Sequence, residues 1–359
     1  MNLRKLSRAV AVTGVAVTVA LAASTSAHAQ KRVKWKMQSA FGSSLPHLGE
    51  SGVRFSDNVK RLSDGNFDIK FFEPGALVPA LECFDSASKG SVESCWTTPG
   101  YHTGKLGSGV AFFTAVPFGP QIGEFLAWKW FGGGNAIRDE AYAAHGLGAV
   151  DDFCIGPETS GWFKKEYGGV DELRGMKMRF FGLGARVMQK LGVSTQLLAG
   201  ADIYPALEKG VIDATEFSMP DIDQNLGFYQ IAKFNYYPGW HQQVSCSEFL
   251  YNQAKFDELP DSYQAMIEIA AGYEVIYTYV DSEAKNPAAM NAMQSKYGVT
   301  NKRWADADLA KLEAAWNEVM AEESEKDPLF KAAAESYAAW RAVYKGWGDA
   351  QSLDSTYLE

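Results

Sequence analysis

The sequence predicts an α/β protein in which mostly parallel strands are covered by helices, and in which this arrangement occurs twice. Strand-like and helix-like stretches alternate as β-α-β-α-β over residues 33–98. A similar alternation resumes after about residue 150. The segment 204–214 (YPALEKGVIDA) also resembles 78–93 (VPALECFDSASKGSVE), and each predicts a helix, a glycine that ends it and a strand. We therefore expect two similar α/β lobes.

The first half provides the elements of one lobe. Residues 33–40 alternate in polarity like a strand, and apolar residues recur at helical spacing over 46–63. Gly65 follows that helix as a left-handed cap. A strand over 66–72, a turn at 73–75, a helix over 77–88 and a strand over 92–98 are expected next.

The second half repeats the pattern. Strands are expected over 148–154, 177–181, 194–197 and 214–217, with helices over 184–191 and 201–210. After Pro260 the chain is strongly helical to Tyr344, and residues 306–344 are expected to form one long alanine-rich helix. Because no Pro/Ser-rich linker is found, the crossings between the lobes should be extended strands or helices.

The N-terminus has the pattern of a secretory signal peptide. Arg4, Lys5 and Arg8 precede an apolar run over 9–23, and 27–29 (AHA) fits a cleavage site, which places the cut after Ala29. An uncleaved anchor is the alternative. Removing 29 of 359 residues leaves 330, and the loss of three positive charges takes the net charge from −9 to −12. This acidity argues against nucleic acid as a partner, and no later segment is long and apolar enough for membrane insertion.

The four cysteines match no zinc-binding spacing. Because all four stand in apolar surroundings, the first interpretation is buried thiols. An oxidising compartment permits disulfides, and a Cys154–Cys246 bridge is the alternative.

Arg179 stands inside an otherwise apolar strand, KMRFF. A buried guanidinium needs a partner, and its planar fork of donors suits a carboxylate held by two parallel hydrogen bonds. Arg179 is therefore a candidate for binding a carboxylate ligand. Structural pairing with a nearby Asp or Glu is the alternative.

Several motifs together resemble the periplasmic solute receptors of TRAP (tripartite ATP-independent periplasmic) transporters. The general family pattern is found in VDELRGMKMR and YPALEKGVIDATEF. The stretches TAVPFG, WFGGG and YYPGWHQQ resemble more narrowly the branch that binds 2-oxoacids and similar monocarboxylates. Further similarity lies in QSAFGSSLP, EPGALVPALECFDSASKGSVE, GWFKKEY and NQAKFDELP, so the resemblance covers essentially the whole chain after the signal.

The resemblance implies a two-lobe periplasmic binding protein fold with a central cleft, whose lobes are joined by extended strands and a long helix. It implies a receptor and not an enzyme, with Arg179 clamping the ligand carboxylate. The expected organisation is lobe I over 30–153, completed by about 246–285, and lobe II over 154–245. Helices over 286–359 should pack across the lobes.

The resemblance also implies a cation beside the ligand. Its ligands would be Glu158, Glu216, the main-chain oxygen of Phe217 and Gln242, with Gln243 as the alternative to Gln242. Relative to the branch pattern, the acid and the amide at 158 and 242 are exchanged. Hard oxygen ligands suit Na⁺ or Ca²⁺. The alternative for the two glutamates is a solvated loop acid and a helix-capping acid.

Aromatic residues are expected to form the apolar walls of the site. Phe217 and Trp240 flank the proposed cation ligands, and Tyr101 and His102 follow the strand at 92–98, where parallel strands end and ligands bind. Phe41 is a weaker candidate. Simple packing at the lobe interface is the alternative for Tyr101.

The leading hypothesis is a periplasmic receptor for pyruvate, lactate or a similar small carboxylate that delivers its ligand to TRAP membrane subunits. One alternative is an exported hydrolase that uses a carboxylate pair such as Glu158 and Glu216. Another is a sensor subunit that presents the ligand to a signalling partner. A homodimer through the C-terminal helix is a further expectation.

Overall fold

The computed structural model describes residues 31–351, so the predicted signal peptide over 1–29 lies outside the described residues. The strands from residue 33 onward form two sheets. In the first, β1 (Val33–Ser39) lies between β2 (Phe67–Phe72) and β3 (Ser94–Thr97) and is parallel to both. β10 (Ser245–Asn252) runs antiparallel between β3 and β4 (Leu147–Ile155).

The second sheet has the strand order β11-β9-β5-β8-β6-β7. Its parallel part consists of β6 (Lys177–Arg179), β7 (Ser194–Gln196) and β8 (Ala214–Thr215). β5 (Gly161–Phe163) is antiparallel to β8 and to β9 (Phe234–Tyr237), and β11 (Thr300–Arg303) is parallel to β9.

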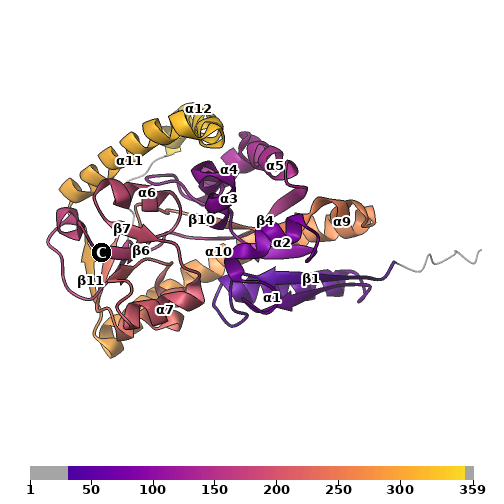
Figure 1. The fold of residues 1–359 in the computed structure, drawn as a ribbon, viewed down its shortest axis with the longest axis horizontal. Coiled ribbons are helices and arrows are strands. Elements are labelled where there is room, and N and C mark those ends of the chain that lie inside the picture. Colours follow the sequence, from indigo (N-terminus) through magenta and orange to yellow (C-terminus); the bar gives the residue numbers. More distant parts are fainter. Residues whose placement is uncertain (1–30, 352–359) are drawn as a thin grey trace, which may run out of the picture. The chain divides into compact units, whose positions relative to one another are not determined.

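Helices cover both sheets, and one long helix connects them (Figure 1). α10 (Asp261–Tyr297) packs against β4 and α1 (Leu48–Leu62) of the first half and against α8 (Pro220–Leu226) of the second. α11 (Asp306–Lys326) lies along α6 (Gly182–Lys190). The remaining α-helices are α2 (Cys83–Ser88), α3 (Thr103–Leu106), α4 (Ile122–Phe131), α5 (Gly134–Ala143), α7 (Gly200–Glu208), α9 (Gln253–Asp257) and α12 (Pro328–Gln351).

The structure confirms the expected α/β class with two sheets, joined by strands and a long helix. The crossing from β4 to β5 is extended, whereas the crossing from β9 to β10 contains a turn around residues 239–242. The internal repeat is also present, because α2 and α7 each end at a lysine that is followed by a glycine, Gly90 or Gly210, with φ +70°. Only glycine adopts this conformation without strain, which explains why both helices stop there.

Three expectations about the elements were wrong. The first sheet was expected to be mostly parallel, but β10 runs antiparallel to both of its neighbours, β3 and β4. The helix predicted over 77–88 is only α2, preceded by a short 3₁₀ turn over Ala80–Glu82. The helix predicted over 306–344 is two helices that meet at Asp327, whose carboxylate accepts hydrogen bonds from the Leu329 and Phe330 amides. Pro328 lacks an amide hydrogen and therefore starts a new helix more easily than it continues the old one.

The cysteines form two disulfides, so the interpretation as buried thiols was wrong. Cys154 and Cys246 stand opposite each other in the antiparallel pair β4–β10, and this bridge was the alternative expectation. The other bridge, Cys83–Cys95, joins α2 to β3 and was not expected. Both Cα separations, 4.1 and 6.1 Å, lie near or within the range that a disulfide spans.

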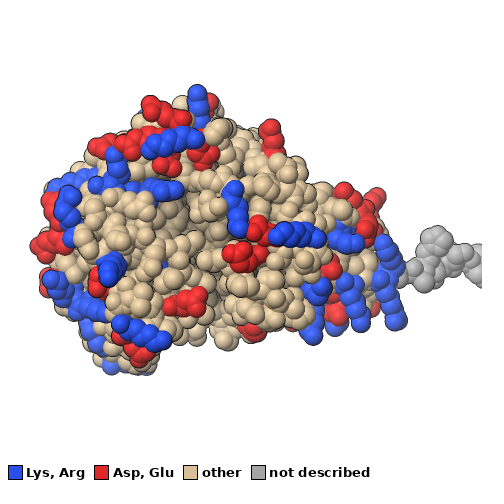
Figure 2. Space-filling model, in the orientation of Figure 1, with Lys and Arg blue, Asp and Glu red and all other residues tan. Residues whose placement is uncertain are grey.

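Among the described residues, no helix combines the length and apolar character needed to cross a membrane. On the face drawn in Figure 2, basic and acidic residues are interspersed over most of the surface, and basic residues gather at its lower right end.

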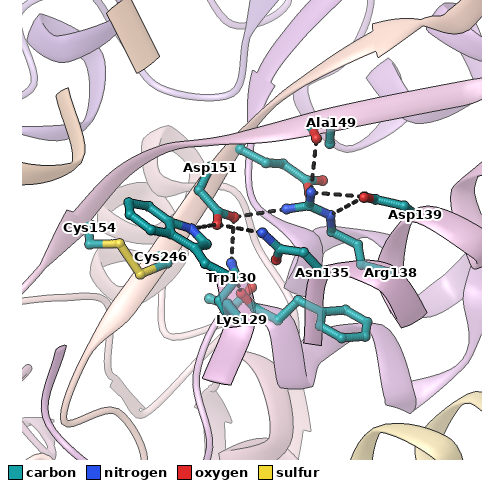
Figure 3. Close-up of polar contacts among 12 residues, drawn as sticks. Lys129, Trp130, Asn135, Arg138, Asp139, Ala149, Asp151, Cys154 and Cys246 are labelled. Carbon is teal, nitrogen blue, oxygen red and sulfur yellow. Dashed lines mark hydrogen bonds and ion pairs between the residues drawn. A yellow bond between two sulfur atoms is a disulfide. The ribbon is translucent and has the colours of Figure 1, made fainter. Parts of the chain in front are cut away.

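A buried charge cluster fixes α4 and α5 on β4 (Figure 3). Asp151 accepts hydrogen bonds from Lys129 Nζ at 2.6 Å and from Arg138 Nη1 at 2.8 Å, and its second oxygen accepts from Trp130 and Asn135. Burial by itself would raise the pKa of Asp151. The lowering by Lys129 and Arg138 is larger than this effect, so the pKa of Asp151 lies below its ordinary value. The carboxylate is therefore the shared counter-ion of two buried cations.

We expect Asp151→Ala to lower the free energy of unfolding by about 3–5 kcal/mol, because it removes the carboxylate that pairs with buried Lys129 and leaves Arg138 with only the partly exposed Asp139. Chemical denaturation monitored by circular dichroism measures this. Asp139→Ala is the matched control, since Asp139 also accepts from Arg138 but its side chain is 53% exposed. An exposed pair contributes about 0–1 kcal/mol, so equal losses in the two variants would contradict the assignment.

Candidate ligand-binding site

A small cavity lies where loops from the two sheets meet. The cavity is narrow, because the centre of a water-sized sphere can occupy only about 30 Å³ of it. The lining is mainly aromatic and aliphatic, with polar groups at a few points: Phe41, Leu48, Thr98, Tyr101, Phe153, Ile155, Glu158, Arg179, Phe181, Phe217, Ser218, Gln242, Ser245 and Ser247. An apolar wall with a few fixed polar groups is typical of a small-molecule site.

Arg179 is the basic residue of this lining, and the sheet places it there. It is the last residue of β6, and its side chain is 1% exposed. Its Nη1 donates to the main-chain oxygen of Glu216 at 2.7 Å and to Glu216 Oε1 at 3.0 Å, while Nε donates to the Leu198 oxygen at 3.2 Å. Arg179 is therefore paired with a glutamate, as the alternative interpretation expected, and it also borders the cavity, so that carboxylate binding by Arg179 stays a prediction.

Two glutamates and a histidine converge beside Arg179. Glu158 lies on the crossing from β4 to β5, Glu216 directly follows β8, and His241 lies on the crossing from β9 to β10. His241 Nε2 is 3.5 Å from Glu158 Oε2 and 3.8 Å from Glu216 Oε2. All three side chains are buried, and one atom from each fits within 4.8 Å of the others.

The other oxygen of each carboxylate is held by the protein. Glu158 Oε1 accepts from Gln242 Nε2 at 3.3 Å. Glu216 Oε1 accepts from Arg179 and from the Phe181 amide. Each carboxylate is thus anchored through one oxygen and directs its second oxygen toward His241.

The electrostatics of the cluster are strongly coupled. Burial raises the pKa of Glu158, and the lowering by His241 does not cancel this effect. Burial also acts to raise the pKa of Glu216, but Arg179 and His241 outweigh it, and the net pKa lies below its ordinary value. Burial lowers the pKa of His241, while Glu158 and Glu216 raise it to about 9. The two acids therefore create a strong local demand for positive charge.

Several buried atoms of this cluster fit a bound cation. Among residues 31–351, the structure gives no hydrogen-bond partner to Glu158 Oε2, Glu216 Oε2, Gln242 Oε1, Ser218 Oγ or either ring nitrogen of His241. Buried polar atoms are normally paired, so such a concentration indicates a group that these atoms would bind. Two acids that face one space also repel each other without a positive charge between them. Glu158, Glu216 and Gln242 could supply oxygen ligands to that charge.

Close backbone approach holds these loops together. A Cβ on Gly239 would overlap the main-chain oxygen of Glu158, and a Cβ on Gly100 would overlap the ring of Phe181. Gly239 therefore allows the two crossings to touch, and Gly100 allows the loop after β3 to reach the loop after β6. These contacts place Glu158 near Gln242 and Tyr101 near Phe181, with ring centroids 5.4 Å apart in the second pair.

The structure brings most of the predicted site residues together. Arg179, Glu158, Phe217, Gln242 and Tyr101 line the cavity, and Glu216 lies directly behind Arg179. Burial raises the pKa of Tyr101 to about 12, so its hydroxyl is neutral and can donate a hydrogen bond. Phe41, the weaker candidate, also lines the cavity.

Two predicted residues and one alternative lie elsewhere. His102 turns away and lies 3.2 Å from Glu248, with its ring against Phe84. Trp240 packs against Phe118 and Phe180 and does not line the cavity. Gln243, the alternative to Gln242, donates to the Gly239 oxygen instead. Neighbours in a tight turn point in different directions, so adjacency in sequence did not predict a shared cavity.

His241 is the functional residue that sequence reasoning missed. It stands between Trp240 and Gln242, both of which were predicted, and within residues 31–351 it is the histidine that lies beside both Glu158 and Glu216. A signal was available, because a histidine beside a proposed cation ligand is itself a candidate ligand. Phe181 was also missed, although its ring contacts Tyr101 and it lies two residues after the KMR strand.

Comparison with known proteins places this arrangement in a family. The model of bacterial extracellular solute-binding protein family 7 (DctP) matches residues 40–327. The monocarboxylate 2-oxoacid-binding periplasmic protein of Nostoc sp. is 33% identical over 322 residues, which cover 89% of this chain and 87% of that protein.

Solved structures of TRAP solute-binding proteins have the same fold as this chain. One is a TRAP transporter solute-binding protein from Bordetella bronchiseptica, solved as a mixed-occupancy dimer with copurified calcium and picolinate. It is 31% identical to this chain with a TM-score of 0.86, and the match covers 90% of this chain and 95% of that protein. A TRAP periplasmic solute-binding protein from Pseudoalteromonas atlantica with bound sodium and pyruvate is 30% identical with a TM-score of 0.85, over 89% and 97%. These proteins are receptors and not enzymes, which removes the hydrolase alternative. The chain therefore belongs to the DctP family of bacterial extracellular solute-binding proteins, the solute receptors of TRAP transporters.

Proposed function

We propose that this protein is a periplasmic receptor that binds a small monocarboxylate, a 2-oxoacid such as pyruvate or a 2-hydroxyacid such as lactate, together with one cation. The observation that carries the proposal is that Arg179 and Glu158 border one small cavity, while Glu216 lies directly behind Arg179 and both glutamates keep one buried oxygen without a hydrogen-bond partner. The relatives named for 2-oxoacids, or solved with pyruvate and sodium, support the same ligand class.

The roles follow from the contacts of each group. Arg179 holds the ligand carboxylate through the part of its guanidinium that faces the cavity, since its Nε and Nη1 already donate to protein oxygens. The cation binds Glu158, Glu216, Gln242 and the main-chain oxygen of Phe217, and it also binds the ligand. Tyr101 donates to the keto or hydroxyl oxygen, while Phe41, Phe153 and Phe217 exclude water.

Charge explains why the cation is needed. The two acids carry two negative charges and the ligand a third, while Arg179 supplies one positive charge. Without a metal ion, protonated His241 is the second positive charge that offsets the two acids. Sodium or calcium would take over that role and would in addition attract the ligand oxygens directly. Binding of the cation and of the ligand must therefore strengthen each other equally.

Delivery requires the cavity to open. Tyr101 and Phe181 come from different sheets and close the cavity by an edge contact. We propose that the sheets separate to exchange ligand, and that the closed form is the one which the membrane subunits of a TRAP transporter recognise.

Arg179→Lys should weaken pyruvate or lactate binding by about 2–5 kcal/mol, because a point charge cannot reproduce the fork yet still neutralises Glu216. Isothermal titration calorimetry measures the affinity. Arg54→Lys is the matched control, since Arg54 forms a similar pair with Glu274 away from the cavity. Parent-like affinity in Arg179→Lys would remove Arg179 from the carboxylate site.

Glu158→Gln should weaken both cation binding and pyruvate binding at least about tenfold, because it removes one of the two charges that face the ion. The double variant Glu158→Gln with Gln242→Glu restores the charge on the neighbouring side chain, 3.3 Å away, and should recover most of the affinity. Titrations with pyruvate at varied Ca²⁺ or Na⁺, after chelation, test both expectations. Pyruvate affinity that is independent of any cation would eliminate the ion from this mechanism.

We also propose that α12 mediates a homodimer. Val343 and Trp347 on this helix are 78% and 61% exposed, and one similar structure is described as a dimer. The double variant Val343→Glu with Trp347→Glu should shift the protein to a monomer in analytical ultracentrifugation. Ile269→Glu, at a 68% exposed position on α10, is the control. A parent protein that is monomeric at high concentration would contradict the assignment.

A further inference from the structure

We propose that His241 is a direct nitrogen ligand of the cation, and that this site therefore prefers a divalent transition-metal ion such as Mn²⁺, Co²⁺ or Zn²⁺ over Na⁺ or Ca²⁺. The inference rests on the proposed function, because it concerns the same cation, but it changes the chemical class of the ion. Imidazole nitrogen binds first-row transition metals well, whereas alkali and alkaline-earth ions favour oxygen.

The ring of His241 is fixed where a ligand would have to be. Its ring packs edge-on against Phe180, with centroids 5.0 Å apart, and its side chain is fully buried. A Cβ on Gly184 of α6 would come within 2.8 Å of the His241 Cβ, so a glycine there lets the helix press against the histidine. The ring is therefore held by apolar contacts, and neither nitrogen has a hydrogen-bond partner among the described residues. An ion that binds here displaces the proton from Nε2.

The separations suit atoms that share an ion. Nε2 lies 3.5 and 3.8 Å from the two carboxylate oxygens, which is too far for good hydrogen bonds. Two ligands at roughly 2.1–2.4 Å from one ion, seen at about right to tetrahedral angles, are about 3.0–3.9 Å apart. The three atoms thus have the spacing of one coordination sphere.

The supporting contacts also match a metal site. Each carboxylate is oriented through its other oxygen, Glu158 by Gln242 and Glu216 by Arg179 and the Phe181 amide. Such outer contacts orient metal ligands and are part of most metal sites. One nitrogen and two carboxylates, with a place left for ligand oxygens, form a mixed donor set that oxygen-preferring ions do not require.

The test compares ions on chelated protein. Mn²⁺, Co²⁺, Zn²⁺, Ca²⁺ and Na⁺ are titrated separately, with and without pyruvate, and native mass spectrometry counts the bound ions. We expect the transition ions to bind at least about tenfold tighter than Ca²⁺. Nitrogen coordination is read directly from ¹⁴N modulation in pulsed electron paramagnetic resonance of bound Mn²⁺, which needs no variant.

His241→Gln places an oxygen near the position of Nε2. It should reduce the advantage of Co²⁺ and Zn²⁺ over Ca²⁺ by at least about tenfold and abolish the ¹⁴N signal, with Ca²⁺ binding largely retained. His145→Gln, the same change at an exposed histidine, should alter neither. Circular dichroism establishes that both variants are folded.

The outcomes separate this inference from the proposed function. Tighter Ca²⁺ or Na⁺ binding in the parent, absence of ¹⁴N coupling, or an unchanged ion preference in His241→Gln would each overturn the nitrogen ligand while leaving the receptor in place. Pyruvate that binds with no ion of any kind would overturn both the nitrogen ligand and the cation of the proposed function. If transition ions bind through nitrogen but pyruvate and lactate do not bind, the result would support His241 as a metal ligand and contradict the receptor assignment.

Discussion

The buried ion pair between Arg179 and Glu216 determines how the rest of the site is arranged. The parallel strands β6 and β8 are neighbours, and the register sets Arg179 beside Thr215, so Glu216 begins where both strands end. Arg179 then bonds both the backbone and the side chain of Glu216. A buried pair of this kind adds little net stability, because desolvation offsets much of the attraction. Its value lies in orientation, since it fixes one face of a guanidinium and one oxygen of a carboxylate while leaving the other parts of each group to face the cavity and His241.

The crossings between the sheets contribute the remaining polar groups. Glu158 belongs to the crossing from β4 to β5, and His241 and Gln242 belong to the crossing from β9 to β10. These two segments touch at Gly239, where a side chain would not fit against Glu158. Any movement of one sheet relative to the other must pass through the same segments. On the proposed function, opening would therefore disturb the cation ligands directly, so ion binding and closure are coupled through the backbone and not through a distant relay.

Much of the fold and part of the site could be predicted, because they depend on local sequence patterns and on a few short motifs. The helix, glycine and strand at 78–93 and again at 204–214 gave the repeated α/β units, and Arg179 followed from the rule that a buried guanidinium needs a partner. The direction of β10 was not predictable, since an apolar run reads the same in either direction. The Cys83–Cys95 bridge depends on how α2 lies on β3, which is a tertiary contact. His102 and Tyr101 are adjacent in a 3₁₀ turn, yet one faces Glu248 and the other faces Phe181. Only the folded chain separates such neighbours, and only it reveals that His241 joins the two acids.

The surroundings of Arg179 bear on what the proposed site can bind. An arginine that was free of other partners would attract any anion, but here Glu216 already offsets its charge. The attraction for a carboxylate must then come largely from the cation, which the two glutamates concentrate in the site. A ligand gains most when it offers oxygens to Arg179 and to the ion at once, which a carboxylate next to a keto or hydroxyl oxygen does and a lone carboxylate does less well. The cavity is small and its walls are mostly apolar, so a longer or more polar solute meets either steric exclusion or unpaired polar groups. On the proposed function, selectivity for short 2-oxoacids and 2-hydroxyacids would follow from the same neutralised arginine that would make the cation necessary.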